Sequence, residues 1–97
     1  MNRQGKKPKI RKAVALSYNA SRDYAPKVIA KGSAFMAERI VALAREHGVP
    51  LQQDPQLVEV LAALDLDREI PPELYRAVAE ILAFVYSLTK EEAAGTA

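Results

Sequence analysis

The positions of proline and glycine constrain the fold of this 97-residue chain more than any other feature. Proline lacks a backbone N–H and disfavours helical geometry in the residue before it, and glycine commonly ends helices. The segments between these residues are short, so we expect one small domain built from brief strands and helices. The dividing residues are Pro26, Gly32, Gly48, Pro50, Pro55 and the Pro71–Pro72 pair.

Two of the segments have the pattern of β-strands. Residues 13–19, AVALSYN, alternate larger and smaller side chains, and residues 27–32, KVIAKG, contain a short apolar run. Both patterns are typical of strands that face a core. Asn19, Ser21 and Asp23 favour a turn between them, so we expect an antiparallel hairpin.

Three further segments have the periodicity of helices. After Ser33, a candidate N-cap, apolar side chains recur every three or four residues until Gly48 and Pro50 end the helix. Asp54–Pro55 begins a second helix and Pro71–Pro72 a third, since both place proline at the start. The expected buried stripes are Met36, Ile40, Leu43, Ala44 and His47, then Leu57, Val58, Leu61 and Leu64, then Leu74, Ala77, Val78, Ile81, Leu82, Val85 and Leu88.

Residues 49–53, VPLQQ, complete the expected architecture. They lie between two predicted helices and have room for a short strand, which a right-handed crossover would place parallel to its neighbour. The predicted fold class is therefore α/β: a small mixed β-sheet of about three strands packed with three helices, in a single domain. We assign residues 1–12 to a basic flexible leader, 13–90 to the folded domain and 91–97 to a flexible tail.

Charge is divided unevenly along the chain. Six of the 14 basic residues and no acid lie in the first twelve positions, so the remainder is acidic. The simplest interpretation of this leader is a solvated tail, and the alternative is a contact with nucleic acid or another acidic surface. The leader has no aromatic side chain to stack on bases, which weakens the alternative.

Composition also excludes several classes of protein. No apolar run reaches the roughly 18 residues of a membrane span, and the N-terminus lacks the apolar core of a signal peptide. The chain has no cysteine and hence neither a disulfide nor a thiolate metal site. We therefore expect a cytoplasmic protein.

The search for catalytic or metal-binding residues gives little. His47 stands in the last turn of a helix, where capping or core packing explains it, and no nucleophile motif accompanies it. Asp65, Asp67 and Glu69 have part of the spacing of a calcium loop but lack its glycine and its terminal glutamate. Gly32 opens a helix N-terminus that can bind an anion, although a plain turn explains it more simply. We predict no enzymatic activity, no metal and no cofactor.

Four apolar residues are the candidates for a binding site. Ala25 and Pro26 precede the second strand, and Ala79 and Leu82 lie beside the main stripe of the last helix. If the fold brings them together, they form a groove for a short apolar peptide. The alternative is that all four are ordinary core residues.

The order of the segments resembles that of a known family. AVALSYN, APKVIAKG, VPLQQDPQLVEVL and IPPELYRAVAEILAFVY, within residues 13–88, are similar in order and spacing to the cytoplasmic C-terminal domain of the FlhB/YscU family. These proteins are the export switches of flagellar and other type III secretion systems. The resemblance implies binding of export-gate proteins and export substrates, peripheral association with the membrane export apparatus, and no need for nucleic acid or metal.

The resemblance also implies the site. Family members recognise a short apolar segment of early export substrates through a small hydrophobic patch. Ala25, Pro26, Ala79 and Leu82 match the positions of that patch and keep its compact, apolar character.

Departures from the family pattern bear on function. Members carry a transmembrane region before this domain and cleave themselves at an Asn-Pro-Thr-His tetrapeptide by cyclisation of the asparagine. Pro8, Lys9, Ile10 and Arg11 occupy those positions here, so the cleavage chemistry has no nucleophile. The strand that precedes the cleavage site in the family is either missing here or must come from the leader or from another chain.

We therefore expect a stand-alone, soluble FlhB-like accessory protein of flagellar or type III export. Two alternatives stay open. One is a nucleic-acid-associated or other adaptor that acts through the basic leader, and the other is a role in a pathway unrelated to motility.

Overall fold

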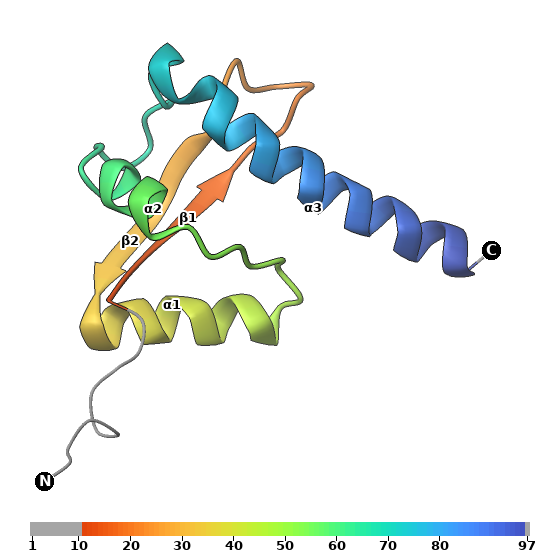
Figure 1. Ribbon diagram of the computed structural model, residues 1–97, viewed down its shortest axis with the longest axis horizontal. Helices are drawn as coiled ribbons and strands as arrows, with labels where there is room; N and C mark the ends of the chain where they lie inside the picture. Colours follow the sequence, from red (N-terminus) through yellow and green to blue (C-terminus); the bar gives the residue numbers. More distant parts are fainter. Residues whose placement is uncertain (1–10, 97) are drawn as a thin grey trace, which may run out of the picture.

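The computed structural model describes residues 11–96, with side chains described from residue 11 to residue 86. Two strands are followed by helices (Figure 1). In chain order the elements are β1 (Lys12–Ser17), β2 (Lys27–Ser33), α1 (Ala34–Glu46), α2 (Pro55–Ala62), the 3-10 turn η2 (Pro72–Leu74) and α3 (Tyr75–Thr96). The predicted α/β class with three helices is confirmed.

β1 and β2 form the predicted antiparallel hairpin. Its register is interrupted once: Ala15 pairs with Ala30, whereas Leu16 pairs with Val28, which leaves Ile29 as an extra residue in β2. Val28 is completely buried and Ile29 is half exposed. The bulge therefore turns Val28 toward the core, on the same side as Leu16.

The predicted third strand is wrong. Within residues 11–96 the sheet consists of β1 and β2 alone, and residues 49–53 form no strand. The Val49 N–H donates to the carbonyl of Ala44 in α1, and Pro50 has no N–H. The beginning of this segment therefore has no donor left for a neighbouring strand.

Residues 67–70, instead of residues 49–53, run beside β2. The Asp67 N–H donates to the Val28 carbonyl at 2.7 Å, and the Ile70 N–H donates to the Pro26 carbonyl at 2.8 Å. An isolated antiparallel bridge pairs Lys27 with Glu69. These bonds fix the backbone at the start of β2, where the predicted site residue Pro26 lies.

The main core lies between the hairpin and helices α2 and α3. Most of the stripes predicted for these two helices are confirmed: Leu57, Leu61 and Val78 are buried, and Leu64, Leu74, Ala77, Ile81 and Leu82 pack against the core. Val58 and Val85 are half-buried, and the Leu88 side chain lies outside the described residues. The predicted N-cap of α2 is also confirmed, since the Asp54 carboxylate accepts from the Leu57 N–H at 3.1 Å. The buried residues of the core are Ala25, Val28, Leu57, Leu61, Ile70 and Val78.

α1 lies across the end of the hairpin farthest from the β1–β2 connection (Figure 1). A Cβ added to Gly32 would stand only 2.8 Å from the Cβ of Met36, so glycine permits this close approach. The predicted buried face of α1 is partly wrong: Ile40 and Ala44 are half-buried, but His47 is exposed. Ala37 is completely buried, whereas Met36 and Leu43 are half exposed, because the small alanine side chain lets the helix approach the strands.

α3 is the longest helix, and its C-terminal half projects away from the hairpin (Figure 1). It continues through residues 91–96, for which we predict a flexible tail, because the glutamates and alanines there are good helix formers. No helix within residues 11–96 combines the length and apolar character that a membrane span requires.

Candidate functional site

The structure brings the four predicted site residues together. Ala25, Pro26, Ala79 and Leu82 all line one open hollow of about 220 Å³, where the β1–β2 connection meets α3. Tyr18, Tyr24, Tyr75 and Val78 complete the lining. The hollow therefore joins residues that lie more than fifty positions apart in the sequence.

α3 supplies one wall. Tyr75, Val78, Ala79 and Leu82 follow the spacing i, i+3, i+4, i+7, which places them on one stripe over about 10 Å of helix. Val78 is completely buried, Leu82 is half-buried and Ala79 is exposed. The stripe thus passes from the core to the surface, and the short side chain of Ala79 leaves room above it.

The residues before β2 supply the floor. Ala25 is 2% exposed and Pro26 is buried. Proline fixes its own φ angle, and its carbonyl accepts from the Ile70 N–H. The floor is therefore held by both covalent geometry and a backbone hydrogen bond.

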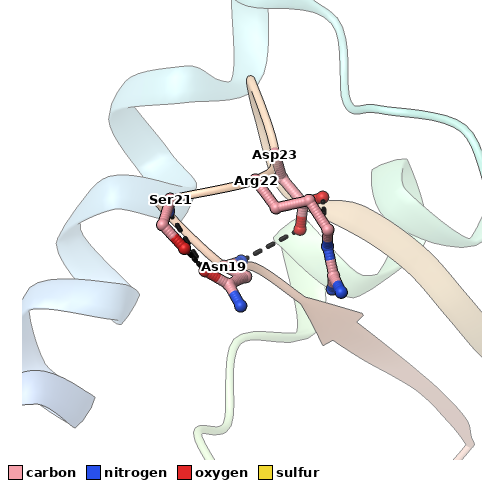
Figure 2. A network of polar contacts seen from close by, with 4 residues as sticks. All are labelled: Asn19, Ser21, Arg22 and Asp23. Carbon is pink, nitrogen blue, oxygen red and sulfur yellow. Dashed lines mark hydrogen bonds and ion pairs between the residues drawn. The ribbon is translucent and has the colours of Figure 1, made fainter.

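A compact polar turn holds the rim (Figure 2). The Asn19 side-chain oxygen accepts from the N–H and the hydroxyl of Ser21, at 3.0 and 2.6 Å. The Asp23 carboxylate accepts from the Asn19 N–H at 2.9 Å, and the Asn19 carbonyl accepts from the N–H groups of Arg22 and Asp23. Since Tyr18 and Tyr24 directly flank this turn, it fixes their backbones relative to one another.

The hydrogen bonds of the turn favour the charged form of the Asp23 carboxyl. The Asn19 N–H lowers the pKa of the Asp23 carboxyl from its ordinary value; burial opposes the shift, and Arg22 adds to it. The Arg22 Nε lies 3.4 Å from the Asp23 carboxylate. Asp23 is therefore ionised at neutral pH, and a hydrogen bond to an ionised acceptor is stronger than a neutral one.

The lining determines what the hollow can accept. It contains five apolar residues, three tyrosines and no charged side chain. Its volume is below the range of about 300–1,000 Å³ that is usual for small-molecule sites. It suits one or two apolar side chains of a peptide, with phenol hydroxyls available for the polar groups of the peptide main chain.

Three tyrosines of the lining are not among the site residues predicted from the sequence. Tyr18 and Tyr75 are half exposed, at 44% and 42%, and Tyr24 is 90% exposed. An aromatic residue on each side of a polar turn, and a third one helical turn before Ala79, were the available signals. Their meaning depends on the hairpin and α3 meeting, which no local pattern shows.

The other candidate residues, His47 and Asp67, lie at a helix end and in a turn. His47 is the C-cap of α1, and its Nδ1 lies 3.0 Å from the Leu43 carbonyl oxygen, as expected for a capping residue. Asp67 adopts a left-handed conformation with φ of 63°, in the turn that borders β2. Residues 11–86, whose side chains the structure describes, contain no group of three or more histidine, cysteine, aspartate or glutamate side chains that could hold a metal ion.

The positions of the family's cleavage tetrapeptide lie mostly beyond the structure. Pro8, Lys9 and Ile10 are outside the described residues. Arg11 is exposed at the entry to β1, and its carbonyl accepts from the Ala34 N–H at 2.9 Å. The predicted leader likewise lies outside the described residues up to residue 10.

Comparison with other sequences gives a consistent set of relatives. The protein YlqH of Bacillus subtilis (strain 168) is 49% identical over 79 residues, which cover 81% of this chain and 85% of YlqH. The flagellar biosynthetic protein FlhB of Aquifex aeolicus (strain VF5) is 43% identical over 74 residues, or 75% of this chain. This chain spans only 21% of that FlhB.

Solved structures agree with this relationship. The cytoplasmic domain of FlhB from Shewanella putrefaciens has a TM-score of 0.79 and 36% identity, with 87% of this chain and 66% of that one covered. The PscU C-terminal domain has a TM-score of 0.74 and 29% identity, with coverage of 77% and 96%.

The sequence model of the FlhB HrpN YscU SpaS Family matches residues 10–85, which include both strands, α1, α2 and the half of α3 that lines the hollow. The resemblance found in the sequence is thereby confirmed, and the relatives include flagellar biosynthetic proteins. This chain belongs to the FlhB/YscU family.

Proposed function

We propose that this protein is an accessory component of flagellar or type III protein export, and that it binds a short apolar segment of an export substrate in the hollow beside α3. The observation that supports the proposal most is the convergence of Ala25, Pro26, Ala79 and Leu82 on one uncharged hollow. Apolar clefts of this kind at a protein surface commonly bind peptide segments.

The proposed role is binding and not catalysis. The uncharged lining of the hollow provides no general base and no activated nucleophile. Self-cleavage is not part of the role, because Pro8 stands where family members carry the reactive asparagine.

The proposed place of action is the cytoplasmic face of an export gate. The similarity to the cytoplasmic domain of an FlhB protein supports this location. The match covers 85% of YlqH, which supports a role that this domain performs by docking on export-gate proteins.

Replacing Leu82 with aspartate tests the proposal. A carboxylate buried by a bound apolar peptide has no cation in this lining to pair with, and an unpaired buried charge costs several kcal/mol. We expect Leu82→Asp to weaken binding of a fluorescein-labelled N-terminal peptide from an early export substrate by about 100-fold or more. Fluorescence anisotropy titration measures the affinity.

Two further variants make the result interpretable. Ala79→Asp places the same charge at an exposed position of the hollow, where folding is least affected, and should also weaken binding. Leu43→Asp makes the same change on α1, outside the hollow, and should leave affinity unchanged. Normal affinity in both hollow variants would remove the site assignment.

A further inference from the structure

We infer that Tyr24 is an aromatic clamp that closes over the peptide in the hollow, and that the turn of residues 19–23 sets its position. This inference rests on the proposed function, because a cover has a purpose only if the hollow takes a peptide. It identifies the residue that determines how tightly the segment is held.

The exposure of Tyr24 is the first observation. Its side chain lines the hollow yet is 90% exposed, whereas the adjacent Ala25 is 2% exposed. Within residues 11–86, where side chains are described, the Tyr24 hydroxyl has no hydrogen-bond partner. Ring and hydroxyl are therefore both available to a ligand, and tyrosines that become buried on binding often dominate the affinity of an interface.

The backbone on both sides of Tyr24 is the second observation. On one side, Asp23 is fixed to Asn19 by two hydrogen bonds, one through its N–H and one through its carboxylate. On the other side, Ala25 is buried and the Pro26 carbonyl is bonded to Ile70. Closure therefore requires rotation of the tyrosine side chain only, and ordering two side-chain torsions costs little entropy.

The shape of the hollow indicates the ligand. The α3 stripe is about 10 Å long, and an extended chain rises about 3.3 Å per residue, so roughly three residues span it. Such a segment presents one apolar side chain to the floor and its main-chain amides to the rim. The Tyr24 ring would cover the apolar side chain, and its hydroxyl would bond a main-chain group.

Alanine substitution tests the clamp against a matched control. We expect Tyr24→Ala to weaken binding of the same labelled N-terminal peptide about tenfold or more. Tyr24→Phe keeps the ring and should lose only about threefold, the share of one hydrogen bond to a neutral group. Tyr86→Ala removes another exposed tyrosine, 74% exposed on α3 and outside the hollow, and should leave affinity unchanged.

A fluorescent variant tests the closure directly. The chain contains no tryptophan, so Tyr24→Trp introduces a single reporter. Its emission should shift to shorter wavelength when the peptide binds, because the indole leaves water, and the emission of Tyr86→Trp should not shift.

The positioning role of the turn has its own readout. Adding Asn19→Ala to Tyr24→Trp should reduce both the shift and the affinity, and Asn19→Asp, which keeps a side-chain acceptor for Ser21, should restore them. Full affinity and a full shift in the Asn19→Ala protein would show that the turn does not position the clamp.

The outcomes separate this inference from the proposed function. If Leu82→Asp abolishes binding but Tyr24→Ala does not weaken it, the hollow binds the peptide and the clamp is wrong. If Leu82→Asp and Ala79→Asp leave binding intact, the proposed function fails, whatever Tyr24 does. Loss of binding in all three variants, with a blue shift in Tyr24→Trp, supports both.

Discussion

The two ends of the hairpin use small residues to opposite effect. At the α1 end, Gly32 and Ala37 allow helix and strand to approach closely. At the α3 end, Ala25 and Ala79 stand among three tyrosines, and a hollow of about 220 Å³ remains. Small residues therefore accompany close packing at one end of the hairpin and an open apolar surface at the other.

The two ends of the hairpin should therefore contribute to different properties: the α1 end to stability and the α3 end to binding. At the α1 end, Gly32 faces Met36 with no room for a Cβ, so the sequence there is constrained by packing. The α3 end leaves apolar surface unfilled, and its rim is held by a polar turn rather than by contacts across the hollow. Substitutions at the two ends should therefore affect different measurements.

The largest difference is expected between two alanine-to-leucine changes. Ala37 is completely buried, so Ala37→Leu should lower the free energy of unfolding by about 3 kcal/mol through overpacking. Ala79→Leu adds the same atoms at an exposed position and should change it by less than about 0.5 kcal/mol, while filling the hollow and weakening peptide binding. Urea denaturation measures both, and equal losses would erase the distinction between the two ends.

Gly32→Ala tests the close approach of α1 more gently. The added Cβ would meet the Met36 Cβ at 2.8 Å and the Ile40 Cδ1 at 3.3 Å, so the helix backbone must shift. We expect a loss of about 1–2 kcal/mol in the free energy of unfolding, with peptide affinity unchanged. An unchanged unfolding midpoint would show that this end is looser than the distances indicate.

At the α3 end, Asp23 should give a pH-dependent effect. Its pKa is lowered in the folded protein, so the unfolded chain takes up the proton first as the pH falls. The stabilisation from Asp23 is therefore complete at neutral pH and is lost below about pH 4, as the pH falls through the folded pKa. Asp23→Ala should be less stable than the parent at pH 7, and the gap should narrow in denaturation curves measured toward pH 2.

Asp23→Ala also tests whether the turn of residues 19–23 positions the Tyr24 clamp. Asp23→Ala removes the acceptor for the Asn19 N–H and should also weaken peptide binding several-fold at pH 7. A stability gap that is constant from pH 7 to pH 2 would mean that the carboxylate charge does not hold the turn.

The smallest effect is expected at the first residue of α1. Ala34 has a φ of 51°, a left-handed conformation that costs a residue with a Cβ about 1 kcal/mol. Ala34→Gly removes this cost but makes the unfolded chain more flexible, so the net gain should be at most about 1 kcal/mol. A clear loss of stability in thermal denaturation would show that the Ala34 methyl makes contacts that outweigh the strain.

The sequence predicted the parts of the fold that depend on local chemistry. The hairpin, the Asp54 N-cap and the stripes of α2 and α3 follow from turn residues, capping and periodicity. The face of α1 was misassigned because periodicity favours the larger Met36, whereas packing selects the smaller Ala37. The strand at residues 49–53 failed because a strand needs a partner, and that is not a local property.

The candidate site was likewise predictable only in part from the sequence. Ala25, Pro26, Ala79 and Leu82 are predicted from their apolar character and from the family resemblance, and the structure places them around one hollow. The three tyrosines of the lining are not predicted from the sequence, because Tyr18 and Tyr24 meet Tyr75 only through the packing of the hairpin against α3.

Chemical-shift mapping tests the central claim most directly. A ¹⁵N-labelled sample of the full chain would be titrated with the N-terminal peptide of an early export substrate. We predict saturable amide shifts that cluster at Tyr24, Ala25, Ala79 and Leu82, with Gly32 and Ala37 unmoved. Shifts centred on Gly32 and Ala37, or no shift at the α3 end at saturating peptide, would contradict the claim that the α3 end of the hairpin is the binding end.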